Sequence, residues 1–287
     1  MATLLFERKA SAFAATFFLV VASSQGIAQT IPPHAEGLSE EFISVPIDNG
    51  SQVGVLSRRK GTASPSRLIV LLPGYPSVVR PAMANNVMAS SQLTGNFLIR
   101  ARRHLANDQV MTLLVDCHTS IGSICTPSYQ ASRDRYRHVK SLIEAAKKRA
   151  PSIKQIYLVS TSAGSISSAF IAKYGQSEFA GVIHTASIDP TAPRSYAELN
   201  NFDYSAIKIP QAFIHHIDDP CRITGYNYIR SVSERYRVPL ISVSGGEGFT
   251  GDACAAHTQH GFKGRESAVM QRILRMVSGG SWNSSRL

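Results

Sequence analysis

Six short, continuous apolar runs recur along this chain, and they constrain its fold more than any other feature. Each run holds five or six residues and lacks the polar alternation of a strand that faces water on one side. Such runs predict strands that are buried on both faces, as in a parallel sheet. They span residues 67–72, 110–115, 155–159, 181–185, 211–215 and 239–243.

Amphipathic helical patterns separate or follow these runs. Apolar residues recur at helix spacing between residues 115 and 155, beside Arg135, Lys140 and Lys147. Alternating buried strands and amphipathic helices predict an α/β fold, in which a mainly parallel central sheet is flanked by helices on both faces. Residues 41–58 alternate instead like antiparallel strands at one edge. The apolar helical positions are Val139, Leu142, Ile143 and Ala146, and near the C-terminus Val269, Ile273, Met276 and Val277.

Composition sets the class of protein. The chain has 287 residues, of which 44% are hydrophobic and 17% are charged, so it can bury a full core and is neither disordered nor collagen-like. Its net charge of +11 mildly favours anionic surfaces or substrates. The basic segment 133–149 is better explained as the solvated face of an amphipathic helix than as a nucleic-acid site.

The N-terminal segment has the pattern of a secretory signal peptide. Arg8 and Lys9 precede an apolar run over residues 12–22, and small residues follow at Gly26 and Ala28. Eleven apolar residues are too few to cross a bilayer, which needs about 20. We therefore expect residues 1–28 to be removed after Ala28, and residues 29–287 to form a single domain, periplasmic or secreted, without stable membrane insertion.

Export makes the four cysteines interpretable. An even number of cysteines in an oxidising compartment predicts two disulfides, for which three pairings are possible. We favour Cys117 with Cys125, which closes a short loop, and Cys221 with Cys254. A metal site is less well supported because no C-x-x-C spacing is present.

The segment around Ser162 carries the strongest chemical signal. A predicted strand runs into Ser160-Thr161-Ser162-Ala163-Gly164, and a helical segment follows. A serine at the centre of a tight strand–turn–helix connection is the arrangement of a nucleophile elbow. Ser160 stands where glycine is usual, so the pattern is S-x-S-x-G. A serine-rich turn that only caps a helix is the alternative.

Downstream residues favour catalysis. An acidic pair, Asp218-Asp219, follows the strand that ends at His215, and His257 and His260 follow the last strand. Serine, then acid, then histidine is the chain order of α/β-hydrolases. Over residues 40–278 the chain resembles the α/β-hydrolase superfamily, and most of all the compact lid-less esterases of the dienelactone-hydrolase type.

This resemblance implies roles for individual residues. Ser162 would be the nucleophile, His260 the general base and Asp219 the acid that orients it. Asp219 is selected because the family's acid stands three residues after a His-Gly pair, whose place His215-His216 takes here. Asp218 is the alternative acid and Asp189 a weaker one. His257 is the alternative base.

Two backbone N–H groups would form the oxyanion hole. We expect one from Ala163, directly after the nucleophile, and one from Tyr75, in the turn after the strand 67–72. Most relatives carry His-Gly where this chain has Pro73-Gly74. The alternative is an ordinary Pro-Gly turn.

The assigned roles favour the second disulfide. Cys221 lies two residues after Asp219, and Cys254 lies six residues before His260. A bond between them would tie the acid loop to the base loop.

The sequence thus predicts a serine hydrolase that cleaves small-molecule or polymeric carboxylic esters without a cofactor or metal. A metal site built from His215, His216 and the acidic pair is disfavoured, because neighbouring side chains on a strand point to opposite faces. Residues 187–210 are too few for a large lid. An acyltransferase or amidase with the same triad, and a non-catalytic binding protein on this scaffold, are the alternatives. Nucleic acid is not an expected partner, and no sequence feature specifies an oligomeric state.

Overall fold

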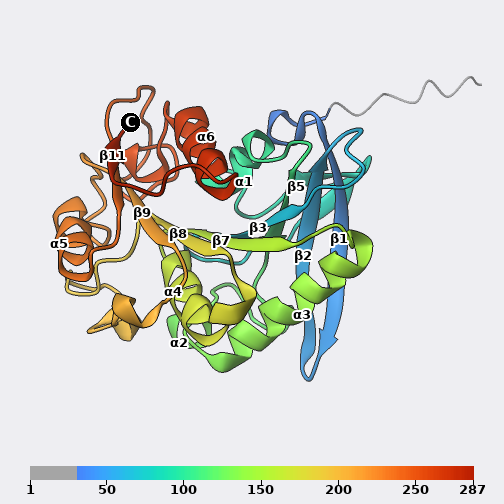
Figure 1. Ribbon diagram of the computed structural model, residues 1–287, viewed down its shortest axis with the longest axis horizontal. Helices are drawn as coiled ribbons and strands as arrows, with labels where there is room; N and C mark the ends of the chain where they lie inside the picture. The colour runs from blue at the N-terminus through green and yellow to red at the C-terminus, as the bar shows by residue number, and fades with distance from the viewer. Residues whose placement is uncertain (1–30) are drawn as a thin grey trace, which may run out of the picture. The chain divides into compact units, whose positions relative to one another are not determined.

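A single mixed sheet organises the molecule. In the computed structural model, which describes residues 31–287, nine strands lie in the order β1-β2-β6-β3-β7-β8-β9-β10-β11 (Figure 1). β1 and β2 pair antiparallel at one edge, and β6 to β11 with β3 run parallel. The predicted fold class is therefore confirmed. The strands are β1 (Leu38–Ile47), β2 (Gly50–Arg59), β3 (Arg67–Leu72), β6 (Val110–Val115), β7 (Gln155–Thr161), β8 (Gly181–Thr185), β9 (Gln211–His216), β10 (Leu240–Val243) and β11 (Ser285–Arg286); β4 (Ala82–Ala84) and β5 (Val87–Ser90) form a separate hairpin.

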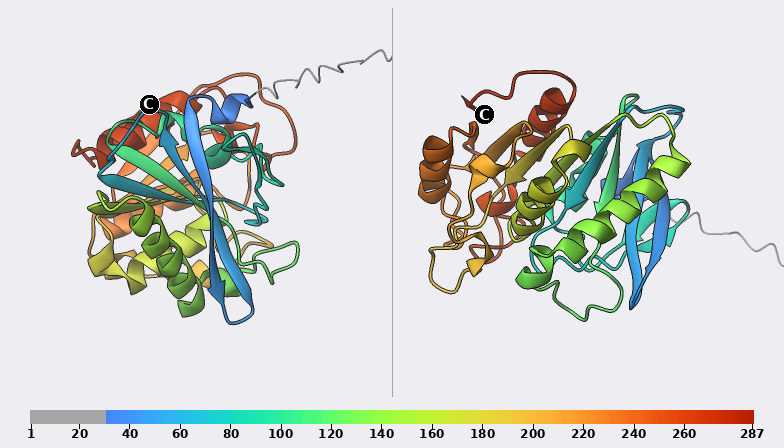
Figure 2. Two further views of the ribbon diagram at one scale, coloured as in Figure 1. Left: turned by 90° about the vertical axis from the view of Figure 1, so that its right-hand side faces the viewer. Right: turned by 60° about the horizontal axis from the view of Figure 1, so that its bottom comes forward.

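Helices cover both faces of this sheet. Figure 1 shows α1 and α6 above it and α2, α3 and α4 below it, and the turned views of Figure 2 show the same layers. The α-helices are α1 (Phe97–Arg100), α2 (Pro127–Gln130), α3 (Arg133–Arg149), α4 (Gly164–Tyr174), α5 (Tyr226–Tyr236) and α6 (Glu266–Val277). The short 3-10 helices are η1 (Pro33–Ala35), η2 (Arg102–His104), η3 (Gln176–Glu178), η4 (Ala197–Leu199), η5 (Tyr204–Ala206) and η6 (Gln259–Gly261).

The core has two parts, one on each face. Leu68 and Val70 of β3 pack into the cluster that α3, α4 and α5 cover, whereas Ile69 and Leu71 pack into the cluster under α1 and α6. Because successive residues of a strand face opposite sides, a strand between two helical layers must be apolar at every position. This is the physical origin of the continuous apolar runs.

Helix α3 departs from its predicted pattern at one position. Its apolar residues are buried as expected, but Arg135, which the sequence places among solvated charges, is also buried and donates from Nη1 to the carbonyl oxygen of Asp116 at 2.8 Å. A buried guanidinium needs such an acceptor. The prediction of a uniformly solvated basic face was wrong here.

The topology determines where a site can form. The chain leaves β3 for β6 on one side and later leaves β7 for β8 on the other, so the connections diverge between β3 and β7. In open parallel sheets, ligands bind at the carboxyl ends of the strands beside such a switch point. The turn after β3 and the turn after β7 meet there.

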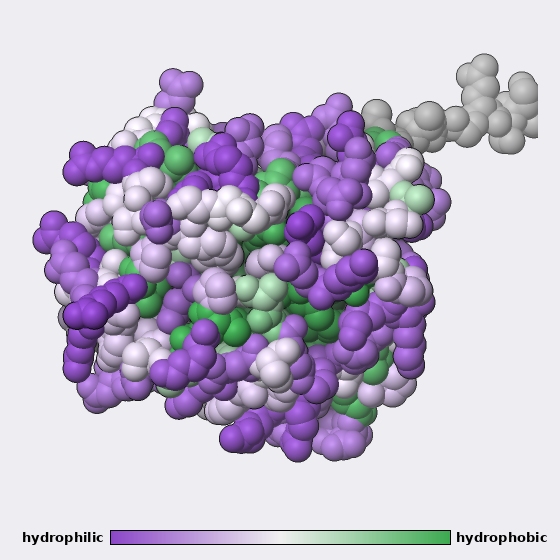
Figure 3. All heavy atoms as spheres, in the orientation of Figure 1, coloured by the Kyte–Doolittle hydropathy of each residue, from purple (hydrophilic) through white to green (hydrophobic). Residues whose placement is uncertain are grey.

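The face shown in Figure 3 is largely polar, and residues 31–287 include no lid domain. Figure 3 shows hydrophilic residues over most of the visible face, with hydrophobic residues mainly towards its centre. Residues 187–210 contain only the 3-10 helices η4 and η5. None of the helices within residues 31–287 is long and apolar enough to cross a bilayer. Those residues form one compact unit, and the predicted signal peptide, residues 1–28, lies outside the described residues.

Candidate active site

Ser162 sits on a sharp turn between β7 and α4. Its φ is +52°, a left-handed conformation that non-glycine residues rarely adopt. The chain can turn so closely because residue 164 is glycine: a Cβ there would lie 2.2 Å from the carbonyl oxygen of Leu72. Ala163 follows as the N-cap, and α4 begins at Gly164. This is the geometry that the sequence predicts for a nucleophile elbow.

Ser160, at the position where glycine is usual, has a buried polar partner. Its hydroxyl lies 2.7 Å from Ser168 Oγ in α4, and Ser168 Oγ lies 2.7 Å from His184 Nδ1 in β8. Complete burial lowers the pKa of His184 to about 3, so this histidine is neutral at ordinary pH. The hydroxyl of Ser160 therefore fits because α4 satisfies it.

Asp219 and His260 form a buried pair. His260 Nδ1 donates to Asp219 Oδ2 at 3.1 Å, and the side chains are 8% and 0% exposed, respectively. Asp219 follows β9 and His260 lies in η6, so the pair joins the loops that follow β9 and β10. Of the two adjacent acids, the structure gives this contact to Asp219.

Three further residues surround the Asp219 carboxylate. Thr224 Oγ1 donates to Oδ2 at 2.9 Å, and His215 Nε2 lies 3.3 Å from the same oxygen. The backbone N–H of Cys221 donates to Oδ1 at 2.9 Å. Burial alone would raise the pKa of Asp219, but the hydrogen bonds and charges of His215 and His260 hold it well below its usual range. The acid is therefore an anion that can orient the His260 ring.

The alternative residues lie elsewhere. Asp218 is exposed, and Asp189 accepts hydrogen bonds from Thr191 in its own loop. His257 is exposed and lies beside Gly95. None of these three side chains forms a hydrogen bond or ion pair with Asp219 or His260.

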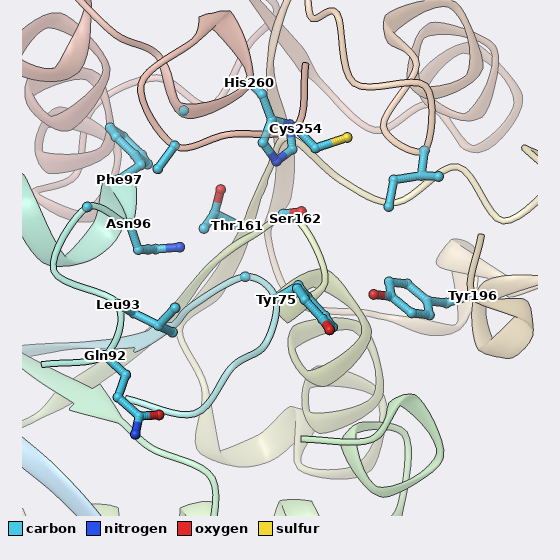
Figure 4. Close-up of a pocket in the computed structure, with 15 residues that line it drawn as sticks. Tyr75, Gln92, Leu93, Asn96, Phe97, Thr161, Ser162, Tyr196, Cys254 and His260 are labelled. Carbon is cyan, nitrogen blue, oxygen red and sulfur yellow. The ribbon is translucent and has the colours of Figure 1, made fainter. Parts of the chain in front are cut away.

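Ser162 and His260 line the same pocket. Figure 4 shows the imidazole directly beside Ser162, although Ser162 Oγ and His260 Nε2 form no hydrogen bond in the structure. Catalytic hydrogen bonds are often long until substrate binds. The pocket is about 330 Å³ and has a largely apolar wall made by Tyr75, Leu93, Phe97, Tyr196 and Ile223.

The expected oxyanion donors are free. Among residues 31–287, the N–H groups of Ala163 and Tyr75 have no acceptor. Gly74 brings the Tyr75 turn against Ser162, because a Cβ on Gly74 would lie 2.9 Å from Ser162 Cβ. Ser77 holds this turn by donating from Oγ to the carbonyl oxygens of Pro73 and Gly74 at 2.9 and 3.0 Å. Both N–H groups are thus available to a ligand.

Both favoured disulfides are present in the structure. Cys117 is bonded to Cys125, and Cys221 to Cys254. The second bond joins the loop of Asp219 to the segment that leads to His260, and Cys254 itself lines the pocket. Two disulfides indicate an oxidising compartment.

The neighbouring histidines of β9 have separate partners. His216 Nε2 lies 2.8 Å from the carbonyl oxygen of Gly245, while His215 contacts Asp219. Among residues 31–287, no group of three or more His, Cys, Asp or Glu side chains is placed to hold a metal ion.

The sequence interpretation missed the roles of His215 and Thr224. His215 had a usable signal, since a polar residue inside a fully buried strand needs a partner. Thr224 had none, because an isolated threonine in a loop is compatible with almost any position.

Known proteins resemble this chain in fold rather than in sequence. No family model and no curated protein matches the sequence. A cold-adapted esterase from an Arctic intertidal metagenomic library is 8% identical, with a TM-score of 0.57 over 84% of this chain and 94% of that chain. A serine hydrolase without a lid from Xanthomonas campestris is 11% identical, with a TM-score of 0.55 over 86% and 98%. An α/β serine hydrolase homologue from Coxiella burnetii is 13% identical, with a TM-score of 0.54 over 83% and 97%. The chain therefore has the α/β-hydrolase fold.

Proposed function

We propose that this chain, with its α/β-hydrolase fold, is a serine hydrolase that cleaves carboxylic esters through Ser162, His260 and Asp219. The observation that carries the proposal is the Asp219–His260 pair, 3.1 Å apart, beside a serine on a strained turn in the same pocket. A carboxylate that accepts from Nδ1–H fixes the neutral tautomer whose lone pair is on Nε2, the nitrogen towards Ser162.

The chemistry proceeds in two stages. Nε2 of His260 takes the proton of Ser162 Oγ as the oxygen attacks the acyl carbon, and the imidazolium then gives that proton to the leaving alkoxide. The N–H groups of Ala163 and Tyr75 stabilise the oxyanion. Water, deprotonated by the same histidine, then attacks the acyl carbon, and the imidazolium returns the proton to Ser162 Oγ as the bond to the acyl group breaks.

The pocket favours compact substrates. A volume of about 330 Å³ with an apolar wall accommodates a short or compact acyl group but not an extended lipid chain. Residues 187–210 add no helical cap, so no lid movement is needed for entry. We expect activity on accessible, short-acyl esters, and little on triglycerides.

The protein acts outside the cytoplasm in this proposal. The basic and apolar pattern of residues 1–28 and the two disulfides both support export to the periplasm or medium. N-terminal sequencing of the exported protein should give Gln29 as the first residue. Retention of Met1 in the exported protein would contradict this.

Hydrolysis of a series of p-nitrophenyl esters tests the function. We expect the wild type to cleave short acyl esters and Ser162→Ala, His260→Ala and Asp219→Asn to lose about 10⁴-fold or more in kcat. Asp218→Asn and His257→Ala are matched controls, because these residues lie outside the site, and they should keep wild-type rates. Equal rates in the wild type and Ser162→Ala would overturn the proposal, and no turnover of any ester would favour a binding protein.

A further inference from the structure

The side chain of Asn96 has an orientation that its neighbours dictate. Asn96 caps α1, and its Oδ1 accepts the backbone N–H of Leu98 at 3.1 Å. A backbone N–H can only donate, so the amide atom that faces it must be the oxygen. The NH₂ group must therefore point the other way, and Figure 4 shows it pointing into the pocket.

This NH₂ group lies beside the nucleophile. The point where Gly74 would carry a Cβ is 3.6 Å from Asn96 Nδ2 and 2.9 Å from Ser162 Cβ. Gly74 also precedes Tyr75, whose N–H is one of the two proposed oxyanion donors. Asn96 Nδ2 makes no hydrogen bond to any residue in the described part of the chain, so both its protons are available to a ligand.

The position of Asn96 is fixed relative to the base. Arg100 donates from Nη1 to the carbonyl oxygen of Gly95 and from Nη2 to that of Gly261, each at 2.7 Å. These acceptors are the chain neighbours of Asn96 and His260. Phe97, which follows Asn96, packs against Phe262, which follows Gly261, with their ring centroids 4.9 Å apart. A donor held in this way costs little reorganisation during the reaction.

We propose that the Asn96 amide is a third oxyanion donor, which binds the carbonyl oxygen of the substrate and strengthens that hydrogen bond as the tetrahedral intermediate forms. This inference rests on the proposed ester hydrolysis. Asn96 is then a catalytic residue, because Nδ2 touches the reacting oxygen. No bond to Asn96 forms or breaks, since it only donates a hydrogen bond to the developing charge.

Two substitutions separate this role from helix capping. Asn96→Asp and Asn96→Ser both keep a side-chain oxygen that can cap α1, so both should keep the thermal unfolding midpoint of the wild type. Both lose the NH₂ donor. We expect kcat to fall about 10²-fold in Asn96→Ser with little change in KM, because the donor acts mainly in the transition state. Asn96→Asp should lose more, because its carboxylate repels the oxyanion.

Gln271 provides the matched control. It is an exposed amide in α6, where its Nε2 donates to Ser267 Oγ at 3.1 Å, and it does not line the pocket. Gln271→Ser should keep kcat within about twofold of the wild type, because it lies outside the pocket that holds Ser162. A phenylboronic acid, which forms a tetrahedral adduct with the serine, should bind more weakly to Asn96→Ser by a factor similar to the loss in kcat.

The outcomes are distinguishable. If Asn96→Ser keeps wild-type kcat and boronate affinity while Ser162→Ala is inactive, Asn96 is only a cap and this inference is wrong, although the function stands. A rise in KM at unchanged kcat also overturns it. If the wild type and Ser162→Ala turn over esters equally, the function and this inference fall together.

Discussion

The two sides of the pocket are held in place by different means. The oxyanion side comprises residues 73–80 and the segment closed by Cys117–Cys125, and the acid–base side comprises the loops of Asp219 and His260 joined by Cys221–Cys254. Each side thus has one disulfide. The two disulfides differ in the number of buried hydrogen bonds that support the chain around them.

The oxyanion side has many buried anchors. The fully buried Asp116 carboxylate accepts the backbone N–H groups of Val79, Arg80 and Cys117 at 2.6 to 2.9 Å. The N–H of Cys125 donates to the carbonyl oxygen of Pro76 at 2.9 Å. Removal of the disulfide would leave these hydrogen bonds intact.

On the acid–base side, buried hydrogen bonds hold Asp219, but the segment that leads to His260 has few such anchors. Residues 244–254 are exposed throughout, and Cys254 at their end is tied to the buried Cys221. The Cys221–Cys254 disulfide therefore holds an exposed segment that few other interactions keep in place. We infer that catalysis depends on Cys221–Cys254 much more than on Cys117–Cys125.

Gly74→Ala should have the largest effect, on the oxyanion side. Its Cβ would press on Ser162 Cβ and displace the Tyr75 turn, which we expect to lower kcat about 10³-fold. Gly122→Ala is the control on the same side, because a Cβ on Gly122 has nothing within 4 Å. Steady-state kinetics of both variants test this. Wild-type kcat in Gly74→Ala would show that the turn does not supply a donor.

Removal of each disulfide tests the comparison itself. Cys221→Ser with Cys254→Ser should lose about 10²-fold in kcat/KM, because a small displacement of the acid or base is enough. Cys117→Ser with Cys125→Ser should lose stability and keep kcat below its unfolding temperature. Loop lengths of 33 and 8 residues predict stability losses of about 4 and 2.5 kcal/mol, respectively. Equal losses of activity in the two double variants would break the comparison.

Removal of a single hydroxyl group from each side of the pocket extends the comparison. Thr224 donates to the Asp219 anion, whereas Ser77 donates to the neutral carbonyl oxygens of Pro73 and Gly74. Hydrogen bonds to charged groups contribute about 1.5–3 kcal/mol and neutral ones about 0.5–1.5 kcal/mol. Thr224→Val should therefore reduce the free energy of unfolding more than Ser77→Ala, as measured by urea denaturation. The reverse order would contradict the assigned partners.

The smallest effect concerns pH and the buried histidine beneath the elbow. The pKa of His184 is lowered to about 3 in the folded protein, against about 6.5 when unfolded. Its contribution to stability is thus complete above pH 6.5 and is lost as the pH falls towards 3, by about 1 kcal/mol per pH unit. Urea denaturation at pH 7 and 5.5 should show a weaker pH dependence in His184→Gln than in the wild type. An unchanged slope would mean that folding does not lower the pKa of His184.

The sequence predicted the architecture because a strand that is buried on both faces has a recognisable apolar pattern. A strand between two helical layers must be apolar at each residue, so the runs at β3, β6 and β7 were visible without any partner being known. The elbow was visible for a similar reason, since the turn demands small residues at fixed spacing around Ser162.

The supporting residues were not visible, because their roles depend on partners far away in the chain. Arg135 is buried only because the carbonyl oxygen of Asp116 lies beside it. Thr224 acts only where Asp219 and His260 meet. Asn96 lies in the connection between the β4–β5 hairpin and β6, which the apolar pattern leaves undefined, and its proposed role depends on its place beside Gly74 and Ser162.

Fluorophosphonate labelling with peptide mapping tests the central claim most directly. The account predicts one adduct per chain, on Ser162, formed fast in the wild type, slowly in His260→Ala and not at all in Ser162→Ala. An adduct on another serine, or equally fast labelling without the imidazole at position 260, would contradict it.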